Sequence, residues 1–295
     1  MAPPPFGRLL TAMVTPFDAE GSVDLDAAAA LAVTLVDRDA HDGLVINGTG
    51  GEAPTTTDRE KADLVRAVVD AVGDRAHVVA GIGTNDTAHT LELAAAAEKA
   101  GADGLLAVTP YYSRPPQEGL LAHFRTLADA TGLPVLLYDI PHRAGTAIAS
   151  ETLLRLAEHP RVVGVKDAKS DLVASAFVMA SSDLAYYAGD DALTLPLLSV
   201  GAVGVVGTST HFCGPEVQAL VAAALAGDSA EALRLHRRLL PIFTGIFATQ
   251  GAILVKAALN ALGLPAGPLR PPLVEATDDQ LAQLRIDLAD GGISL

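Results

Sequence analysis

The sequence has little of several things that mark particular classes of protein. It contains one cysteine, Cys213, so no disulfide can form within the chain, which is typical of a reducing compartment. Only 20 residues are Lys or Arg, against 35 Asp and Glu, and the formal net charge is −15. A nucleic-acid partner needs clustered basic side chains. We therefore expect no nucleic-acid partner and a cytoplasmic location.

Long apolar runs are also absent. No stretch approaches the roughly 18 consecutive apolar residues of a membrane span. Residues 1–7 (MAPPPFG) have neither a basic region nor a long apolar core, and so differ from a secretory signal peptide. The eight histidines show no HxH or HExxH spacing. We therefore predict a globular protein with no membrane partner and no metal site.

What the sequence does contain is a regular alternation of short apolar runs with longer amphipathic segments. Nearly continuous apolar runs are typical of strands covered on both faces; eight occur, at residues 9–14, 43–47, 78–81, 104–108, 135–138, 162–166, 184–188 and 203–206. Helical patterns such as 57–72 and 86–99 lie between them, and Thr57 and Asp58 are typical of a helix N-terminus. Eight such units favour a closed (β/α)8 TIM barrel. A doubly wound α/β sheet is the alternative.

The strand pattern stops near residue 215. Segments 216–226, 229–247, 250–262 and 277–289 have helical patterns and are interrupted by a Gly- and Pro-rich stretch at 263–272. We therefore predict a (β/α)8 catalytic barrel over residues 1–225 and a C-terminal helical extension over 226–295 that packs on the barrel.

Lys166 is the leading candidate for chemistry, because a (β/α)8 barrel places its active site at the carboxyl ends of the strands. It follows the apolar run 162–165, and burial lowers the pKa of an ammonium. A neutral amine can attack a ketone to form a Schiff base. The alternative is a lysine that extends to solvent. The other four lysines are assigned ordinary helical or loop positions: Lys61, Lys99, Lys169 and Lys256.

Tyr138 and Thr49 also follow predicted strands. The Tyr138 phenol could relay a proton to and from a forming carbinolamine, and the Thr49 hydroxyl could extend the relay. The glycines around Thr49 (48, 50 and 51) offer free N–H groups for a small anion. A core tyrosine and an unliganded glycine turn are the alternatives. Asp190 and Asp191 are better explained as a helix cap or a solvated loop than as a catalytic pair.

Several ordered motifs resemble those of the dihydrodipicolinate synthase / N-acetylneuraminate lyase family of pyruvate-dependent class I aldolases. They are TAMVTPF at 11–17, GTGGE at 48–52, AGIGTN at 80–85, TPYY at 109–112, YDIPHRAG at 138–145, GVKDA at 164–168, GDD at 189–191 and KAALNAL at 256–262. TPYY followed by SRPPQEG, together with Arg143, is similar to the dihydrodipicolinate synthase branch of actinobacterial type. The resemblance implies a (β/α)8 barrel with a helical extension, usually assembled as a tetramer of two tight dimers.

The resemblance also implies catalytic roles. Lys166 would form the Schiff base with pyruvate, so that no cofactor beyond this covalent link is expected. Tyr138 would be the central proton shuttle with Thr49 as its hydroxyl neighbour. Tyr112 would complete the relay in the partner chain's site, which requires a homo-oligomer.

Four further residues would bind substrate by the same resemblance. Arg143 would hold the carboxylate of the second substrate in a bidentate pair. Gly50 would bind the pyruvate carboxylate through its N–H, and Gly189 and Val206 would line the site through backbone groups.

The activity implied is a lyase-type condensation of pyruvate with L-aspartate semialdehyde to 4-hydroxy-tetrahydrodipicolinate, the entry to diaminopimelate and lysine biosynthesis. One alternative keeps the Schiff base but uses another aldehyde or a 2-keto-3-deoxy sugar acid. The reason to consider it is that Gly50 and His142 depart from the family pattern. The other is a non-catalytic paralogue that serves as an interaction or regulatory subunit, which the retained site residues argue against.

Departures from the family pattern affect the substrate pocket. Gly50 stands where the family has a second hydroxyl residue, which predicts pyruvate binding weaker by about 1 kcal/mol. His142 and Ala144 flank Arg143 where the branch has a small residue and Thr, so the aldehyde pocket is expected to differ. Asp139 replaces the commoner Asn.

The positions that match the family's lysine-inhibition site also depart from its pattern. They read Ala53, Pro54, Asp58, Lys61, Asn85 and His89. Lys61 would repel a lysine ammonium, and His89 replaces the carboxylate that would bind it. The sequence therefore predicts weak or absent feedback inhibition by lysine.

Overall fold

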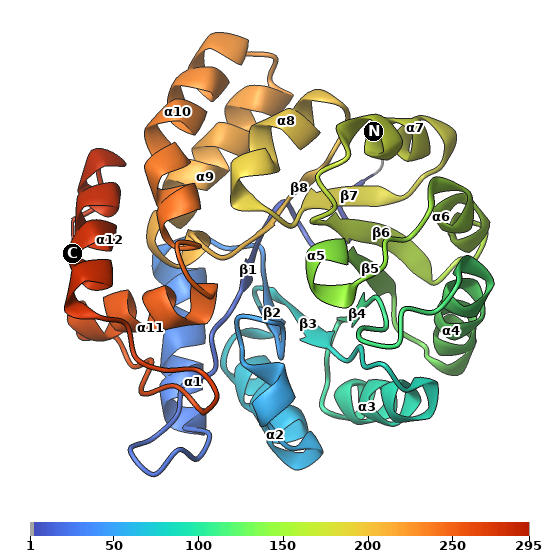
Figure 1. The fold of residues 1–295 in the computed structure, drawn as a ribbon, viewed down its shortest axis with the longest axis horizontal. Coiled ribbons are helices and arrows are strands. Elements are labelled where there is room, and N and C mark those ends of the chain that lie inside the picture. The colour runs from blue at the N-terminus through green and yellow to red at the C-terminus, as the bar shows by residue number, and fades with distance from the viewer. Residues whose placement is uncertain (1–2, 295) are drawn as a thin grey trace.

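A closed barrel of parallel strands lies inside a ring of helices in the computed structural model, which describes residues 3–294 (Figure 1). Met1, Ala2 and Leu295, which belong to the predicted terminal segments, lie outside the described residues. Within this range the strands are β1 (Leu9–Ala12), β2 (Gly43–Ile46), β3 (His77–Gly81), β4 (Gly104–Val108), β5 (Val135–Asp139), β6 (Val162–Asp167), β7 (Ala185–Ala188) and β8 (Gly204–Gly207). The predicted (β/α)8 barrel is confirmed, and the doubly wound alternative is wrong because β1 pairs with β8 and closes the sheet.

The helices follow the strands in alternation and then continue alone. In the described chain they are α1 (Leu25–Val33), α2 (Asp58–Val72), α3 (Thr87–Lys99), α4 (Gln117–Ala130), α5 (Pro141–Ala144), α6 (Ser150–Ala157), α7 (Leu172–Ser181), α8 (Thr194–Ser199), α9 (Thr210–Leu225), α10 (Ser229–Gly245), α11 (Gly251–Ala261) and α12 (Asp278–Asp290). Short turns of other helix types cover Thr34–Arg38, Ala53–Thr55 and Asp191–Leu193. The predicted cap of α2 is confirmed: Thr57 and Glu60 form a reciprocal capping box. No helix among the described residues is both long enough and apolar enough to cross a membrane.

Strand register places the candidate residues side by side. Tyr138 of β5 is the direct partner of Lys166 of β6. Because side chains alternate along a strand, Leu136 and Tyr138 face the barrel interior, whereas Leu137 joins the core between barrel and helices. At the opposite end of the barrel the interior is filled by buried residues that include Tyr187, whose phenol donates a hydrogen bond to the Gly7 carbonyl oxygen at 2.8 Å.

The C-terminal helices pack against the barrel in one shared apolar core. Ile242 of α10 and Leu254 of α11 belong to the same buried cluster as Leu9 of β1. The predicted start of the first of these helices at residue 216 is wrong, because α9 begins at Thr210 and accommodates the sequence Gly-Pro by a kink at Cys213 (φ −124°, ψ 32°). The predicted boundary between residues 225 and 226 falls between α9 and α10 and stays a prediction.

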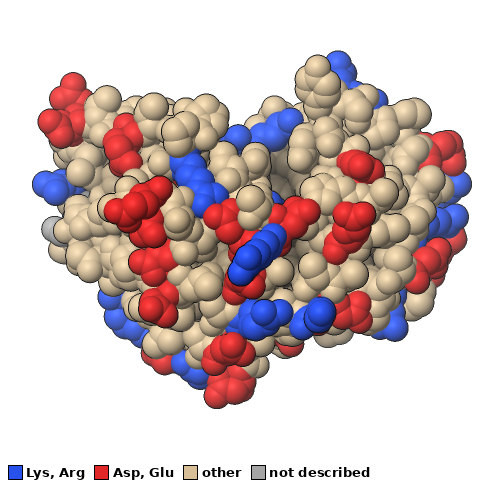
Figure 2. Space-filling view, turned by 90° about the horizontal axis from the view of Figure 1, so that it is seen from below, with Lys and Arg blue, Asp and Glu red and all other residues tan. Residues whose placement is uncertain are grey.

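Charge is mixed on the face seen from below in Figure 2. Acidic side chains are spread over this face and basic ones stand among them, so the net charge of −15 does not form one continuous acidic field there. The molecule is hollowed at the upper edge of this view, and basic side chains border the hollow.

Candidate active site

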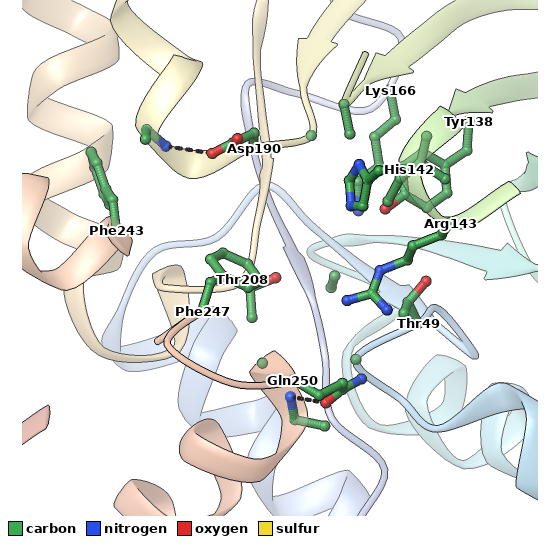
Figure 3. Close-up of a pocket in the computed structure, with 18 of the residues that line it drawn as sticks. Thr49, Tyr138, His142, Arg143, Lys166, Asp190, Thr208, Phe243, Phe247 and Gln250 are labelled. Carbon is green, nitrogen blue, oxygen red and sulfur yellow. Dashed lines mark hydrogen bonds between the residues drawn. The ribbon is translucent and has the colours of Figure 1, made fainter. Parts of the chain in front are cut away.

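A cavity of ≈ 430 Å³ opens at the carboxyl ends of the strands (Figure 3). Predicted site residues from four strand ends line it together: Thr49, Gly50, Tyr138, Arg143, Lys166 and Gly189. The predictions that these residues gather at one mouth of the barrel therefore agree with the geometry. Their individual roles remain predictions.

Lys166 reaches the cavity from β6 with only 5% of its surface exposed. Its Nζ lies 4.4 Å from the centre of the Tyr138 ring. Burial lowers the pKa of Lys166 to about 8, and the negative charge of Asp191 acts in the opposite direction. A considerable fraction of this amine is therefore neutral near pH 8, which is the form that attacks a carbonyl carbon.

The Tyr138 phenol stands beside this amine. Burial raises the pKa of Tyr138 to about 12, while the positive charge of Arg143 and the hydroxyl of Thr49 act to lower it. The phenol therefore remains protonated at neutral pH, so it can donate a proton and take one back. Figure 3 shows the Thr49 hydroxyl and the Arg143 guanidinium on the same side of the cavity as Tyr138.

The loop from Gly48 to Glu52 carries Thr49 and is held by hydrogen bonds within the loop and by one from Thr15. The Gly51 N–H donates to the Gly48 carbonyl oxygen at 3.1 Å, and the Gly51 carbonyl accepts from Thr15 Oγ1 at 2.7 Å. A Cβ on Gly50 would lie 3.3 Å from the Ala12 carbonyl oxygen. This backbone therefore favours glycine at the position where the family usually has a second hydroxyl.

Arg143 lies in α5, the short helix that directly follows β5. Within the described residues its guanidinium has no hydrogen-bond or ion-pair partner, although it lines the cavity. A planar guanidinium in that state can bind a carboxylate ligand in a bidentate pair. His142, the preceding residue, also lines the cavity.

The two aspartates after β7 have different environments. Asp190 lines the cavity and accepts a hydrogen bond from the Ala192 N–H at 3.0 Å, so its prediction as a helix cap is confirmed. A solvated position is wrong for Asp191, which is 1% exposed. Asp191 accepts from the backbone N–H groups of Thr208 at 3.1 Å and Ser209 at 3.0 Å, because the start of α9 leaves these donors without helical partners.

Two predicted site residues lie outside the lining of this cavity. Val206 is fully buried in the barrel interior on β8. Tyr112 is 91% exposed and adopts a left-handed backbone conformation with φ 69°. Its proposed part in a partner's site stays a prediction.

The C-terminal extension supplies lining residues that the sequence did not identify. Phe243, Phe247, Thr249 and Gln250 line the cavity. Figure 3 shows Phe243 and Phe247 across the cavity from Arg143. Nothing in their local pattern distinguishes them from other helix and loop residues, because the packing of α10 and α11 over the barrel mouth decides their place.

The four other lysines lie in helices or a loop as predicted, but the side chains of two of them are largely shielded from solvent. The Lys169 side chain is 9% exposed and pairs with Asp139 at 3.5 Å. Burial raises the pKa of Asp139 to about 6, which Lys169 partly opposes. Lys256 is 0% exposed. Its helix is apolar on nearly every side, as in ILVKAAL, and such a pattern is typical of a buried helix.

Comparisons with known proteins agree with this geometry. The chain matches the Dihydrodipicolinate synthetase family over residues 5–290. It is 67% identical over 294 residues to the 4-hydroxy-tetrahydrodipicolinate synthase of Acidothermus cellulolyticus, covering 100% of this chain and 95% of the relative. It is 62% identical over 291 residues to 4-hydroxy-tetrahydrodipicolinate synthase 2 of Streptomyces coelicolor, covering 99% and 97%. The crystal structure of the DHDPS of Cyanidioschyzon merolae with lysine bound matches with a TM-score of 0.95 at 42% identity, covering 98% and 99%. A match of this extent over the whole barrel and its extension confirms the resemblance read from the motifs, and the chain belongs to the Dihydrodipicolinate synthetase family.

Proposed function

We propose that this protein condenses pyruvate with L-aspartate semialdehyde to 4-hydroxy-tetrahydrodipicolinate, by way of a Schiff base on Lys166. The observation that carries the proposal is the buried amine of Lys166, whose pKa is lowered to about 8, beside the Tyr138 ring in an open cavity. The names of the relatives support this reaction. It is a step toward diaminopimelate and lysine, and we assign it to the cytoplasm.

The reaction begins when the neutral Lys166 amine attacks the C2 carbonyl carbon of pyruvate. Tyr138, with Thr49 as its neighbour, protonates the carbinolamine oxygen so that it leaves as water. The resulting iminium loses a proton from C3 to give an enamine, and the enamine C3 attacks the aldehyde carbon. The amino group of the adduct then attacks C2, closes a six-membered ring and displaces Lys166. One water is released in each cycle.

Substrate binding depends on local donors, because both substrates carry a carboxylate and the protein has a net charge of −15. We assign the pyruvate carboxylate to the Gly50 N–H and the carboxylate of L-aspartate semialdehyde to Arg143. Gly189 borders the reacting atoms through its backbone. No cofactor is required, since the covalent link to Lys166 supplies the electron sink.

We further propose a homotetramer built as a dimer of dimers, with Tyr112 completing the proton relay of the neighbouring subunit. A tyrosine that is 91% exposed in a left-handed backbone conformation packs little within its own chain, which supports a role outside it. Sedimentation of the wild type and of Tyr112→Phe, with activity measured on both, tests this: the variant should stay assembled and lose activity.

Reduction of the pyruvate adduct tests the reaction itself. The protein is incubated with pyruvate, reduced with borohydride and mapped by mass spectrometry, and the adduct is expected on Lys166. Turnover with L-aspartate semialdehyde is then compared with a panel of sugar aldehydes. An absent adduct contradicts the Schiff-base proposal. An adduct together with a preference for a sugar aldehyde favours the second candidate function, the same chemistry on another aldehyde, which the presence of His142 in the cavity wall suggests.

A further inference from the structure

A buried ion pair lies behind the glycine loop of the cavity. Glu52 follows Gly51 directly, and its side chain is 1% exposed. Its Oε1 lies 2.7 Å from Nζ of Lys256 on α11, a side chain that is 0% exposed. Lys256 Nζ also donates a hydrogen bond to the Pro268 carbonyl oxygen at 2.8 Å. The pair thus joins the β2–α2 loop to the C-terminal extension, more than 200 residues away in the sequence.

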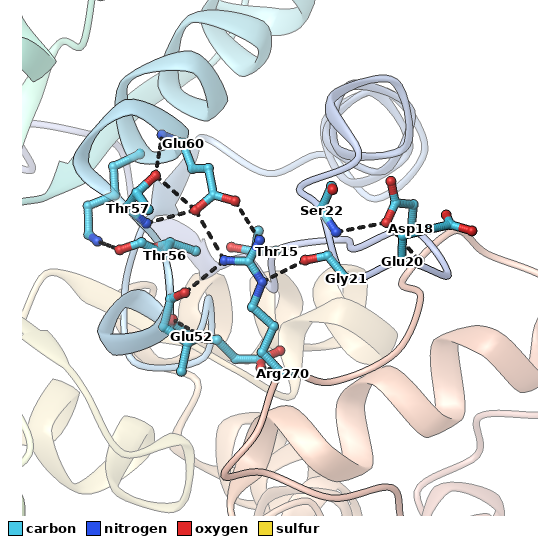
Figure 4. Close-up of polar contacts among 12 residues, drawn as sticks. Thr15, Asp18, Glu20, Gly21, Ser22, Glu52, Thr56, Thr57, Glu60 and Arg270 are labelled. Atoms are coloured by element: carbon cyan, nitrogen blue, oxygen red, sulfur yellow. Dashed lines mark hydrogen bonds and ion pairs between the residues drawn. The ribbon is translucent and has the colours of Figure 1, made fainter.

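Arg270 extends this link on the other side of Glu52. The Arg270 backbone N–H donates to Glu52 Oε2 at 2.9 Å. Its guanidinium reaches the Glu60 carboxylate at 2.5 Å and the Gly21 carbonyl oxygen at 2.7 Å (Figure 4). Both cations contact the Phe17 ring: Lys256 Nζ lies 4.1 Å and the Arg270 guanidinium 4.3 Å from its centre.

The ion pair connects two walls of the cavity. Thr49 and Gly50 line one wall. Glu52, at the end of the same loop, has a left-handed backbone conformation (φ 54°, ψ 35°), which L-residues adopt at a cost in free energy. Gln250 and the first residues of α11 line the other wall, little more than one helical turn before Lys256. The contact between Glu52 and Lys256 therefore ties the glycine loop to α11.

Stability alone does not account for two charges in this place. Moving a carboxylate and an ammonium out of water costs several kcal/mol per ion, and an apolar pair of similar volume often gives equal or higher stability. What a buried ion pair adds is one defined geometry, because any displacement leaves a buried charge without its partner.

We infer that Glu52 and Lys256 are positioning residues for the Schiff-base reaction, which fix the glycine loop so that the Gly50 N–H meets the pyruvate carboxylate and Thr49 stays beside Tyr138. This inference rests on the proposed function of the same cavity. It predicts that loss of the pair impairs pyruvate binding more than it impairs use of the aldehyde, since Arg143 is held by β5 and α5 rather than by this loop.

The test uses Glu52→Gln and Lys256→Met, which remove one charge each and keep most of the side-chain shape. Asn260→Ala is the matched control. Asn260 lies on α11 and holds the same C-terminal segment, donating to the Gly267 carbonyl oxygen at 2.9 Å and accepting from the Gly267 N–H at 3.1 Å. Each variant is titrated with pyruvate, and borohydride-trapped adduct is quantified by intact mass, alongside Tm and the KM for L-aspartate semialdehyde.

Glu52→Gln and Lys256→Met are expected to raise the pyruvate concentration for half-maximal trapping by about tenfold or more. The control should stay within about twofold. In Glu52→Gln and Lys256→Met, the KM for the aldehyde should change less than the pyruvate concentration for half-maximal trapping. Should Lys256→Met fail to fold, the pyruvate titration of the isosteric variant Glu52→Gln alone tests the inference. Variants that lose Tm but trap pyruvate like the wild type overturn the inference. A wild type that traps no pyruvate overturns the proposed function instead.

Discussion

The pH dependence of Schiff-base formation follows directly from the burial of Lys166. With its pKa lowered to about 8, about 9% of the amine is neutral at pH 7, whereas a lysine with an ordinary pKa near 10.4 is about 0.04% neutral. Burial thus increases the reactive form by a factor of roughly 200. The rate of adduct formation should rise about tenfold per pH unit below pH 8 and level off above it.

A substitution of Asp191 tests this reasoning. The negative charge of Asp191 raises the pKa of Lys166 and so opposes the lowering caused by burial. Asp191→Asn should therefore move the midpoint of the pH profile to lower pH. The asparagine oxygen can still accept from the Ser209 N–H, which limits the structural effect. Asp171→Asn is the control, since Asp171 caps α7, lies outside the cavity lining and should leave the midpoint unchanged.

The assay mixes enzyme with pyruvate at pH values from about 6 to 10 and quenches with borohydride at successive times, so that the amine's ionisation is measured apart from later steps. A wild-type midpoint near 10.5, the ordinary lysine value, would contradict the argument. So would a midpoint that moves to higher pH in Asp191→Asn.

Four other outcomes are expected. Lys166→Met should be inactive yet more stable at pH 7 by up to about 3 kcal/mol in denaturant unfolding, because the lowered pKa means that the folded state gives up a proton which the unfolded state holds. That gain should shrink as pH rises from about 8 to above 10.5. Tyr138→Phe should still trap pyruvate at equilibrium but lose about 100-fold or more in kcat, as rapid-quench and steady-state rates would show. Arg143→Lys should raise the KM for L-aspartate semialdehyde by about tenfold while the KM for pyruvate changes little, since the bidentate pair is lost. Millimolar lysine should leave activity nearly unchanged. His89, which pairs with Asp58 at 3.0 Å, stands where a carboxylate would bind the lysine ammonium. Half-inhibition at that concentration would contradict this.

The strands could be predicted from the sequence because each is short, apolar and covered on both faces. β4 coincides with the predicted run 104–108, and β6 extends one residue beyond the predicted run 162–166. The start of α9 could not be predicted, because Gly214 and Pro215 are local signals for a break. The surrounding core outweighs them here: Cys213 takes the non-helical conformation at the kink while its side chain stays buried.

The site was predictable where barrel geometry dictates it and not where tertiary packing does. Residues that follow a strand, such as Thr49 and Tyr138, must meet at one end of a closed barrel. No such rule places Phe247 or Gln250, which reach the cavity because α10 and α11 pack across its mouth. The burial of Asp191 likewise depends on N–H donors from a segment that begins 17 residues later.

Lys166 and Lys256 are both buried lysines, yet their surroundings suit them to opposite tasks. Lys256 pairs with a carboxylate oxygen at 2.7 Å and donates a hydrogen bond to a carbonyl oxygen at 2.8 Å, so its amine is held as an ammonium and its lone pair is not free. Lys166 has no ion-pair partner among the described residues and faces a cavity large enough for substrate, so burial acts on it with little compensation. Nucleophilicity therefore follows from the missing partner rather than from burial itself. Borohydride trapping should accordingly label Lys166 and leave Lys256 unmodified.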